Sequence, residues 1–411
     1  MAIAHNGRVT DLDAFTALFT DEGTALLASL REYDPAQELA VATRLRRTYP
    51  TELVSAALAQ ARLRQRAVPK FGADDAYRMF FTPNGVEQST RKSVAEYRAR
   101  RFAELGVRSV ADLCCGIGGD ALALARAGIS VLAVDRDPLT AEVVRANADA
   151  LGLGSLIEVR CTDVAEVATD PYDAVFVDPA RRGGRGRIFN PEAYSPPLSW
   201  AIGAVAGRPA SGPSPRTAGA IKIAPGIPHE MIPGEAEAEW ISDGGDVKEA
   251  VLWFGTAPGL RRATLLPSGA TLTGRGLPDP AVRTVGRYLY EPDGAVIRAH
   301  LVAEVAEELG GGLIDETIAY VTADELRRTP YATAYEITDE LPFGLKKLKA
   351  LLRERGVGNL TVKKRGSAVE PEEVRRRVKP QGPNAATVIL TRVAGAPTML
   401  IGQPASPPSS P

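Results

Sequence analysis

Apolar residues between positions 100 and 255 gather in short runs that alternate with helical periodicity. These runs are rich in Val, Ile and Leu, and small apolar residues at helical spacing follow the first of them. The four runs that define the pattern are residues 110–113, 130–134, 156–161 and 173–177. Strands that alternate with helices predict an α/β fold, in which helices cover a parallel sheet.

Outside this region the pattern changes twice. Residues 11–67 show helical periodicity with few β-branched runs, and a further helix is expected at 90–104. After residue 256 we expect two alternating strands, then a helix at 299–309 and a strand near 314–321. The N-terminal part is therefore predicted to be helical, and the part after the core to be an α+β module.

Breaks rich in Pro, Gly and Ser suggest where the domains end. Residues 207–219 predict a loop before a strand at 220–223, and residues 246–253 predict a late strand that completes the core. The expected parts are a helical N-terminal domain, an α/β core, a ferredoxin-like α+β module, a basic C-terminal domain and a disordered tail, at residues 1–95, 96–255, 256–332, 333–402 and 403–411.

Composition narrows the class of protein. The chain of 411 residues is 45% apolar with a formal charge of −1, which predicts a multidomain enzyme rather than an indiscriminate binder of polyanions. No apolar run reaches the roughly 20 residues of a membrane helix, and the first residues lack a secretion signal. Three cysteines make no disulfide framework and three histidines make a metal site improbable, so we expect a cytoplasmic protein without metal.

The first predicted strand runs into a glycine-rich turn that carries the candidate chemistry. Asp112 is followed by Cys114, Cys115, Gly116, Gly118 and Gly119 before a helix begins. Glycines between a strand and a helix let the backbone approach a ligand at the helix N-terminus. Such a turn predicts a ligand site, although a plain strand–helix connection has the same composition.

The strands that follow also end in acids. Asp135 lies 23 residues after Asp112 at the tip of the second strand, which suits a pair of ribose hydroxyls. A nicotinamide dinucleotide and S-adenosylmethionine would fit this spacing equally well. The turn lacks the GxGxxG pattern of dinucleotide sites, and Asp112 can meet an α-amino group, which favours the second ligand. Asp163 and Asp178 follow the third and fourth strands.

This series resembles the class I S-adenosylmethionine-dependent methyltransferases. The matching motifs are DLCCGIGGD, VLAVDRDP, CTDV and VFVDPARR, in the order of that family. The resemblance implies a Rossmann-like core with S-adenosyl-L-methionine as cofactor. Asp112, Gly116 and Gly118 would hold the methionine end, Asp135 the ribose, and Asp163 and Val164 the adenine. The complete set of cofactor-binding residues that it implies is Asp112, Cys114, Gly116, Gly118, Asp120, Asp135, Arg136, Asp163 and Val164.

The same resemblance implies that Asp178 and Pro179 are catalytic and face the transferred methyl group. Methyltransferases of exocyclic base amines typically have Pro and an aromatic residue after the Asp-Pro pair, where this chain has Ala180 and Arg181. Arg181 could stack on a base or pair with a phosphate, or it could form a salt bridge at the sheet edge. Asp163 has an alternative role as a helix N-cap, and Asp137 with Pro138 predicts only the start of a helix.

Two further resemblances suggest an RNA substrate. The core is similar to trimethylguanosine synthase-type RNA methyltransferases, which share the Cys beside the glycines and the segment at 79–87, so Phe81 and Thr82 are expected to contact substrate. Residues 337–401 resemble the THUMP-like domain of an uncharacterised bacterial methyltransferase family.

Basic residues are concentrated in two places. Residues 342–380 contain twelve Lys and Arg against four Asp and Glu, and a loop near the fourth strand carries Arg181, Arg182, Arg185 and Arg187. A solvated helix face explains part of the first run, whereas a phosphate-tracking surface is the sharper hypothesis. The residues expected to contact RNA are Arg181, Arg182, Lys363, Lys364 and Arg365.

We therefore expect a methyltransferase that acts on a base of RNA, tRNA or rRNA. Methylation of pyrimidine carbon 5 through a thiolate is excluded, because no cysteine follows Cys161. A protein or small-molecule methyltransferase, and a non-catalytic RNA-binding protein that holds the cofactor, are the alternatives.

Overall fold

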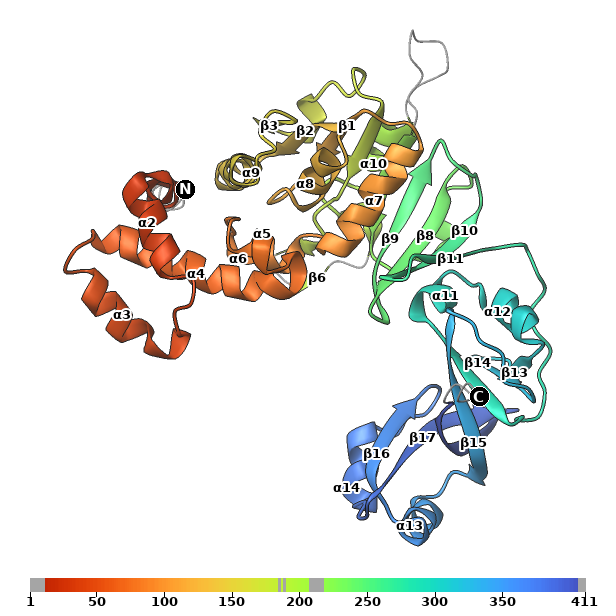
Figure 1. Ribbon diagram of the computed structural model, residues 1–411. Coiled ribbons are helices and arrows are strands. Elements are labelled where there is room, and N and C mark those ends of the chain that lie inside the picture. The colour runs from red at the N-terminus through yellow and green to blue at the C-terminus, as the bar shows by residue number, and fades with distance from the viewer. Residues whose placement is uncertain (1–11, 184–185, 188–189, 207–217, 406–411) are drawn as a thin grey trace, which may run out of the picture. The chain divides into compact units, whose positions relative to one another are not determined.

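The computed structural model describes residues 12–183, 186–187, 190–206 and 218–405 (Figure 1). The chain forms two compact units. The first contains Met1–Ala236 and Val251–Pro258, and the second contains Glu237–Ala250 and Gly259–Pro411. Most of the predicted loop at 207–219 and the end of the predicted tail lie outside the described residues.

The described N-terminal part of the first unit is helical, as the periodicity predicts. Helix α4 is the longest of this group, with 21 residues, and it ends where Gly72 adopts a φ of 78° that favours glycine. The expected domain boundary at residue 95 falls within α7. The elements are η1 (Ala17–Phe19), α2 (Asp21–Ser29), η2 (Pro35–Gln37), α3 (Glu38–Leu45), α4 (Thr51–Phe71), α5 (Ala73–Ala76), α6 (Pro83–Gln88) and α7 (Lys92–Glu104).

A parallel sheet forms the centre of the first unit and confirms the predicted α/β fold. Its strands are β1 (Ser109–Leu113), β2 (Ser130–Asp135), β3 (Ile157–Cys161), β4 (Ala174–Val177) and β7 (Ala218–Ile223), in the order β3-β2-β1-β4-β7. Helices α8 (Gly119–Arg126), α9 (Pro138–Ala150) and α10 (Leu198–Ala206) connect or cover them. The strand order reverses between β1 and β4, so the residues after these strands face one crevice, the usual ligand site of such sheets.

Short elements complete the described part of this unit. They are η3 (Val164–Glu166), η4 (Pro191–Ala193), η5 (His229–Met231), the two-stranded pair β5 (Arg182–Gly183) and β6 (Gly186–Arg187), and the last residues of β9 (Asp246–Phe254).

The second unit contains two groups of strands. The first group is β8 (Glu237–Asp243), β10 (Arg261–Leu266) and β11 (Ala270–Thr273). The second is a seven-stranded sheet in the order β13-β14-β12-β15-β18-β17-β16. Its strands are β12 (Tyr288–Pro292), β13 (Gly312–Asp315), β14 (Ile318–Ala323), β15 (Ala332–Pro342), β16 (Val357–Lys364), β17 (Asn384–Val393) and β18 (Ala396–Pro404). The helices of the unit are α11 (Gly294–Arg298), which packs on β8 and β10, and α12 (Val302–Leu309), α13 (Leu345–Glu354) and α14 (Pro371–Val378).

The second unit differs from the sequence expectations at four points. The module at 256–332 is not separate, because β12 pairs with β15 while β10 and β11 belong to the other group. The helix expected at 299–309 begins at Val302, because His300 adopts a φ of 58°. The strand near 314–321 is a hairpin of β13 and β14, and Gln403 of the expected tail is part of β18 and pairs with Glu336.

Alternation along β17 explains how the sheet packs on both faces. Val388 and Leu390 join Leu348 of α13 and Val374 of α14 in one apolar cluster. Ile389 points to the opposite face, where it joins a second cluster with Leu289 and Tyr320. The period of two positions that marks a strand therefore places α13 and α14 on a single face.

Candidate functional site

The turn between β1 and α8 has a backbone that few residue types adopt. Gly116 and Gly118 have φ values of 56° and 87°, and Cys114 has a φ of 65° without being glycine. A Cβ added at Gly116 would meet no atom within 4 Å, so this residue faces open space. The turn therefore presents main chain to a ligand, as the glycine pattern predicts.

Two hollows lie beside this turn and share Cys114, Asp135 and Ala180. One, of about 270 Å³, extends along residues 82–90 and 178–181. The other, of about 290 Å³, is bordered by Arg136, Asp163, Val164 and Trp200, among others. A ligand that spans both would have one end near Asp178 and the other near Asp163.

Asp135 lies where the two hollows meet. Its carboxylate accepts hydrogen bonds from the backbone amides of Gly116, at 3.1 Å, and Asp137, at 3.0 Å. Burial raises the pKa of Asp135, and the two backbone hydrogen bonds oppose that rise. The carboxylate is thus held in one orientation by the turn, with lone pairs left for a further donor.

The structure shows Asp163 in its alternative role. Its side chain caps η3 by accepting from the Ala165 amide at 2.9 Å, and it is exposed. Val164 and Arg136 border the same hollow, so the residues of the expected adenine end lie together. Asp137 caps α9 with Pro138 in the first turn, as predicted.

A buried network of charges lies behind the hollow near Asp178. Lys222 donates to Asp178 Oδ2 at 2.7 Å and to Thr90 Oγ1 at 2.9 Å, and its side chain is 5% exposed. Thr90 in turn donates to Asp120 Oδ2 at 2.6 Å, and Arg98 pairs with the other oxygen of Asp120. Asp120 is thus tied to two side chains of the protein, which is a structural role.

Lys222 was not among the candidate residues predicted from the sequence. The register pairs Val177 of β4 with Ile221 of β7, which brings Lys222 beside Asp178. A lone lysine between two isoleucines in a buried strand is unusual, because a buried lysine needs a partner. That signal was present in the sequence, but its partner could be identified only from the strand register.

Asp112 is the most isolated charge of the site. It is 1% exposed, and neither carboxylate oxygen has a hydrogen-bond partner within the described chain. Burial raises its pKa well above the usual range, and the charges of Asp120 and Asp178 add to that rise. Three carboxylates and the two cations Arg98 and Lys222 make a cluster of net charge −1 when all are ionised. Such a cluster favours a cationic ligand.

The two cysteines of the turn lie in surroundings that disfavour the thiolate form. Burial raises the pKa of the Cys114 and Cys115 thiols far above their ordinary value, and the nearby carboxylates raise it further. A thiol whose pKa is raised is protonated at neutral pH and does not attack carbon.

One residue expected to contact substrate lies in the core instead. Phe81 is 1% exposed, and its ring packs 5.4 Å from that of Phe71. Its backbone exchanges hydrogen bonds with the Gln60 amide at 2.7 and 3.0 Å. Thr82 borders the hollow near Asp178 but uses its hydroxyl to cap α6, accepting from Gly85 at 3.0 Å.

The basic residues near the fourth strand are only partly described. Arg181 borders the same hollow, is half-buried, and makes no salt bridge at the sheet edge within the described chain. The side chain of Arg182 lies outside the described residues, as does all of Arg185. Pro179 is buried beside Asp178.

The basic triplet of β16 does not offer free charges. Lys363 pairs with Glu291, and Arg365 lies 3.8 Å from another oxygen of the same carboxylate. Lys364 pairs with Glu370. Each of these three side chains has a carboxylate partner, so a phosphate would have to compete with that partner for it.

In the described parts of the chain, no group of His, Cys, Asp and Glu is placed to hold a metal ion. None of the described helices combines the length and the apolar composition of a membrane span.

Comparison with known families supports the α/β core and the C-terminal domain. Residues 110–180 match a methyltransferase domain, residues 332–404 match a THUMP domain-like family, and residues 11–67 match a domain of unknown function, DUF8688. The core match spans β1 to β4, so it contains the glycine turn and Asp178.

Individual relatives point the same way. The chain is 33% identical over 342 residues to uncharacterized S-adenosylmethionine-dependent methyltransferases of Mycobacterium tuberculosis strains CDC 1551 and H37Rv, covering 80% of this chain and 90% of theirs. It is 35% identical over 91 residues to an uncharacterized RNA methyltransferase of Parasynechococcus marenigrum, covering 21% of this chain and 20% of that protein. A crystal structure of a protein from Porphyromonas gingivalis W83, provisionally assigned as a methyltransferase, has the same fold, with a TM-score of 0.73 at 21% identity over 91% of this chain and all of that one.

Proposed function

The chain belongs to the S-adenosylmethionine-dependent methyltransferases, and from that premise we propose that it methylates a base of RNA, in tRNA or rRNA. The enzyme class and the cofactor follow from the relatives. The RNA substrate and the roles of individual residues are the content of the proposal.

The shape and charge of the two hollows support S-adenosylmethionine as the ligand that spans them. Asp112 has no hydrogen-bond partner in the described chain, and it is one of three carboxylates that share the two cations Arg98 and Lys222. This setting favours the methionine end, whose sulfonium and ammonium outnumber its single carboxylate. The Asp135 carboxylate has lone pairs for the ribose hydroxyls, while Arg136, Asp163 and Val164 would surround the adenine. When bound, the cofactor supplies an electrophilic methyl group.

Asp178 is placed to hold the methyl acceptor. Its Oδ2 accepts from Lys222, while Oδ1 has no partner in the described chain, and the residue borders the hollow. This oxygen would accept a hydrogen bond from an N–H or O–H of the incoming base. The lone pair of the acceptor atom would then point at the methyl group. Transfer then depends on proximity and orientation, and the acceptor's proton leaves to Asp178 or to solvent. Lys222 is a positioning residue, because it fixes the carboxylate without facing the hollow.

Unpaired cations on the THUMP-like domain are the observation that carries the RNA part of the proposal. Helices α13 and α14 lie on one face of the sheet and expose a row of basic side chains, with the partly exposed ring of Phe343 at its end. None of these cations has a carboxylate partner within the described residues. They are Lys346, Lys347, Lys349, Arg353, Arg376 and Lys379. Basic side chains beside an exposed aromatic ring suit RNA, whose phosphates pair with the cations and whose bases stack on the ring.

A gene-deletion strain tests the proposal. Nucleosides from its total RNA should lack, or be depleted in, one methylated nucleoside that is present in the parent strain. The wild-type gene should restore that nucleoside, and a gene encoding Asp178→Asn should not. If the nucleoside profiles of the two strains are identical, RNA is not the substrate.

A further inference from the structure

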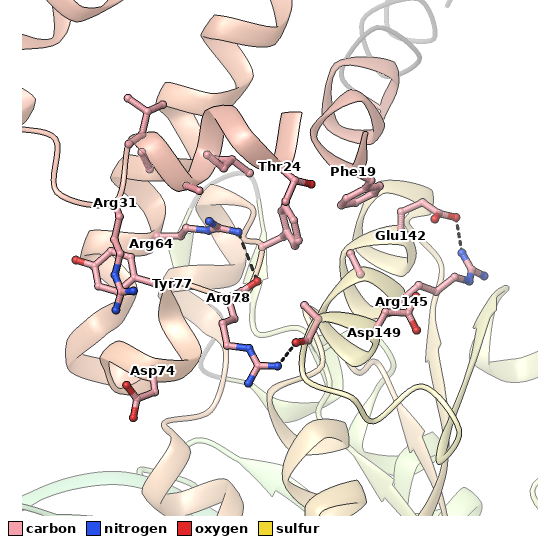
Figure 2. A pocket seen from close by; sticks show the side chains of 17 residues that line it. Phe19, Thr24, Arg31, Arg64, Asp74, Tyr77, Arg78, Glu142, Arg145 and Asp149 are labelled. Atoms are coloured by element: carbon pink, nitrogen blue, oxygen red, sulfur yellow. Dashed lines mark hydrogen bonds and ion pairs between the residues drawn. The ribbon is translucent and has the colours of Figure 1, made fainter. Parts of the chain in front are cut away.

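A large cavity lies on the far side of α9 from the glycine turn and is not part of the site described above. Its volume is about 940 Å³, which is in the range of small-ligand pockets. Helices α2 and α4, the segment 74–80 and the outer face of α9 form its walls, all within the first unit. Figure 2 shows Arg31, Arg64 and Tyr77 on one side and Glu142 and Arg145 on the other.

Arg64 gives this cavity an uncompensated buried charge. It is 8% exposed, and its guanidinium donates to the Met79 carbonyl at 2.8 Å and to the Arg78 carbonyl at 3.4 Å. It also lies 4.9 Å from the centre of the Phe80 ring. No carboxylate pairs with it in the described chain, and burial lowers its pKa to about 10. A buried cation held only by carbonyls and a ring is stabilised further when an anion approaches.

Two more arginines border the cavity with donors to spare. Arg31 is exposed and stacks at 5.1 Å on the Tyr77 ring, with no carboxylate partner in the described residues. Arg78 donates to the Ala150 carbonyl at the end of α9. A guanidinium has five N–H donors, so both retain donors for a phosphate.

The acids of the cavity do not cancel these charges. Glu142 is paired with Arg145 on α9. Asp74 and Asp149 are exposed to solvent, and neither pairs with an arginine in the part of the chain that the structure describes. Acids in water are screened, whereas Arg64 is shielded from it. The buried part of the cavity is therefore cationic.

Aromatic rings add a surface for a base. Phe19 is 39% exposed, which is unusual for so large an apolar side chain, and it lies at the border of the cavity. Its ring packs edge-on at 5.0 Å against Phe15 and Phe80, so it is held rigidly. Rigid exposed rings beside cationic groups are the components of single-stranded nucleic-acid sites.

We propose that this cavity binds one nucleotide of a single-stranded RNA segment, with its phosphate at Arg31, Arg64 and Arg78 and its base on Phe19. The inference rests on the proposed RNA substrate for the source of the nucleotide. It adds a docking position on the N-terminal helices, apart from the carboxyl edge of the sheet where Asp178 lies.

Binding of uridine 5′-monophosphate to the full chain tests this assignment. S-adenosylhomocysteine is added first at a saturating concentration, so that the nucleotide cannot occupy the cofactor hollows. Calorimetry should then show saturable binding of the nucleotide and much weaker binding of uridine or of inorganic phosphate. Absence of saturable binding, or equal affinity for phosphate alone, would overturn the proposal.

Three variants separate the two halves of the site. Arg31→Gln should weaken nucleotide binding about tenfold, because it removes one charge-assisted contact. Phe19→Leu should weaken the binding of the nucleotide and leave the weak binding of inorganic phosphate unchanged. Arg47→Gln is the matched control, since Arg47 is exposed on the same helical region but away from the cavity, and it should bind normally. If Arg31→Gln and Arg47→Gln bind alike, the cavity is not the site. No methyl transfer is measured here, so a failure is distinct from a failure of the proposed function.

Discussion

Asp112 is the residue at which stability and function oppose each other most clearly. Its carboxylate is buried and has no hydrogen-bond partner within the described residues, so its ionised form costs free energy until a cation binds beside it. Residues of this kind are typical of ligand sites, where an unfavourable charge is kept for the sake of binding.

Replacing Asp112 should therefore stabilise the free protein and impair cofactor binding. The pKa of Asp112 is raised in the folded state, whereas it is about 4 in an unfolded chain. Its contribution to stability is present below that unfolded value and is lost as the pH rises through the folded value. Asp112→Asn should thus raise the melting temperature of the free protein, and more so at pH 8 than at pH 5. The same variant should bind S-adenosylmethionine at least about tenfold more weakly. A variant that is destabilised at pH 8 would contradict this account.

Asp135 provides a second test, with a control two residues away. Asp135→Ala should weaken S-adenosylmethionine binding at least about tenfold, because two charge-assisted ribose contacts are lost. Asp137→Ala removes only the cap of α9, so it should cost about 1 kcal/mol of stability and leave the affinity unchanged. Calorimetry on both variants measures the difference. Equal affinities would show that Asp135 serves the turn alone.

Lys222 should affect turnover without impairing cofactor binding. Lys222→Met removes the donor that orients Asp178, so we expect kcat to fall at least about tenfold. The cluster becomes more negative, so the affinity for the cationic cofactor should be kept or rise. Lys222→Arg should restore part of kcat. Loss of cofactor affinity in step with kcat would instead indicate a general structural defect.

Among the elements of the THUMP-like domain, the helices and strand β16 differ in whether their basic side chains have carboxylate partners. Among the described residues, the cations on α13 have no carboxylate partner, whereas Lys363 and Lys364 of β16 are paired with carboxylates. We expect a triple replacement of Lys346, Lys347 and Lys349 by Gln to reduce the slope of log affinity for RNA against log salt concentration. The reduction should be about 2, because each single-strand phosphate contact contributes about 0.7 to that slope. The matched triple replacement of Lys363, Lys364 and Arg365 should change this slope much less. A filter-binding series over salt compares them, and the reverse order would place RNA on β16.

The elements of the core could be predicted from the sequence because their signals are local. The strand that ends at Leu113, the glycine turn and the cap at Asp137 each depend on residues within one turn or strand. The carboxylate partners of the triplet at 363–365 could not be predicted for the opposite reason, since Glu291 is 72 residues from Lys363 in the chain. The prediction that Phe81 contacts substrate was wrong because a local motif does not reveal burial. Lys222 was not predicted because its partner depends on the register of two strands.

For the whole molecule, the two units carry separate parts of the account. The first contains the cofactor hollows, Asp178 and the cavity of the N-terminal helices, and the second contains the exposed cations of α13 and α14. A small acceptor would need only the hollow near Asp178. A large polyanionic substrate would also contact basic and aromatic groups that are far from that hollow in the sequence.

Transfer of labelled methyl groups shows whether RNA is the substrate. Purified protein is incubated with tritiated S-adenosylmethionine and, in separate reactions, with total RNA, total protein or small metabolites of its own cells. We expect tritium in the RNA fraction, where ribonuclease should release the label and protease should not. The Asp178→Asn variant should transfer no label. Label that enters only protein or small molecules would contradict the RNA assignment.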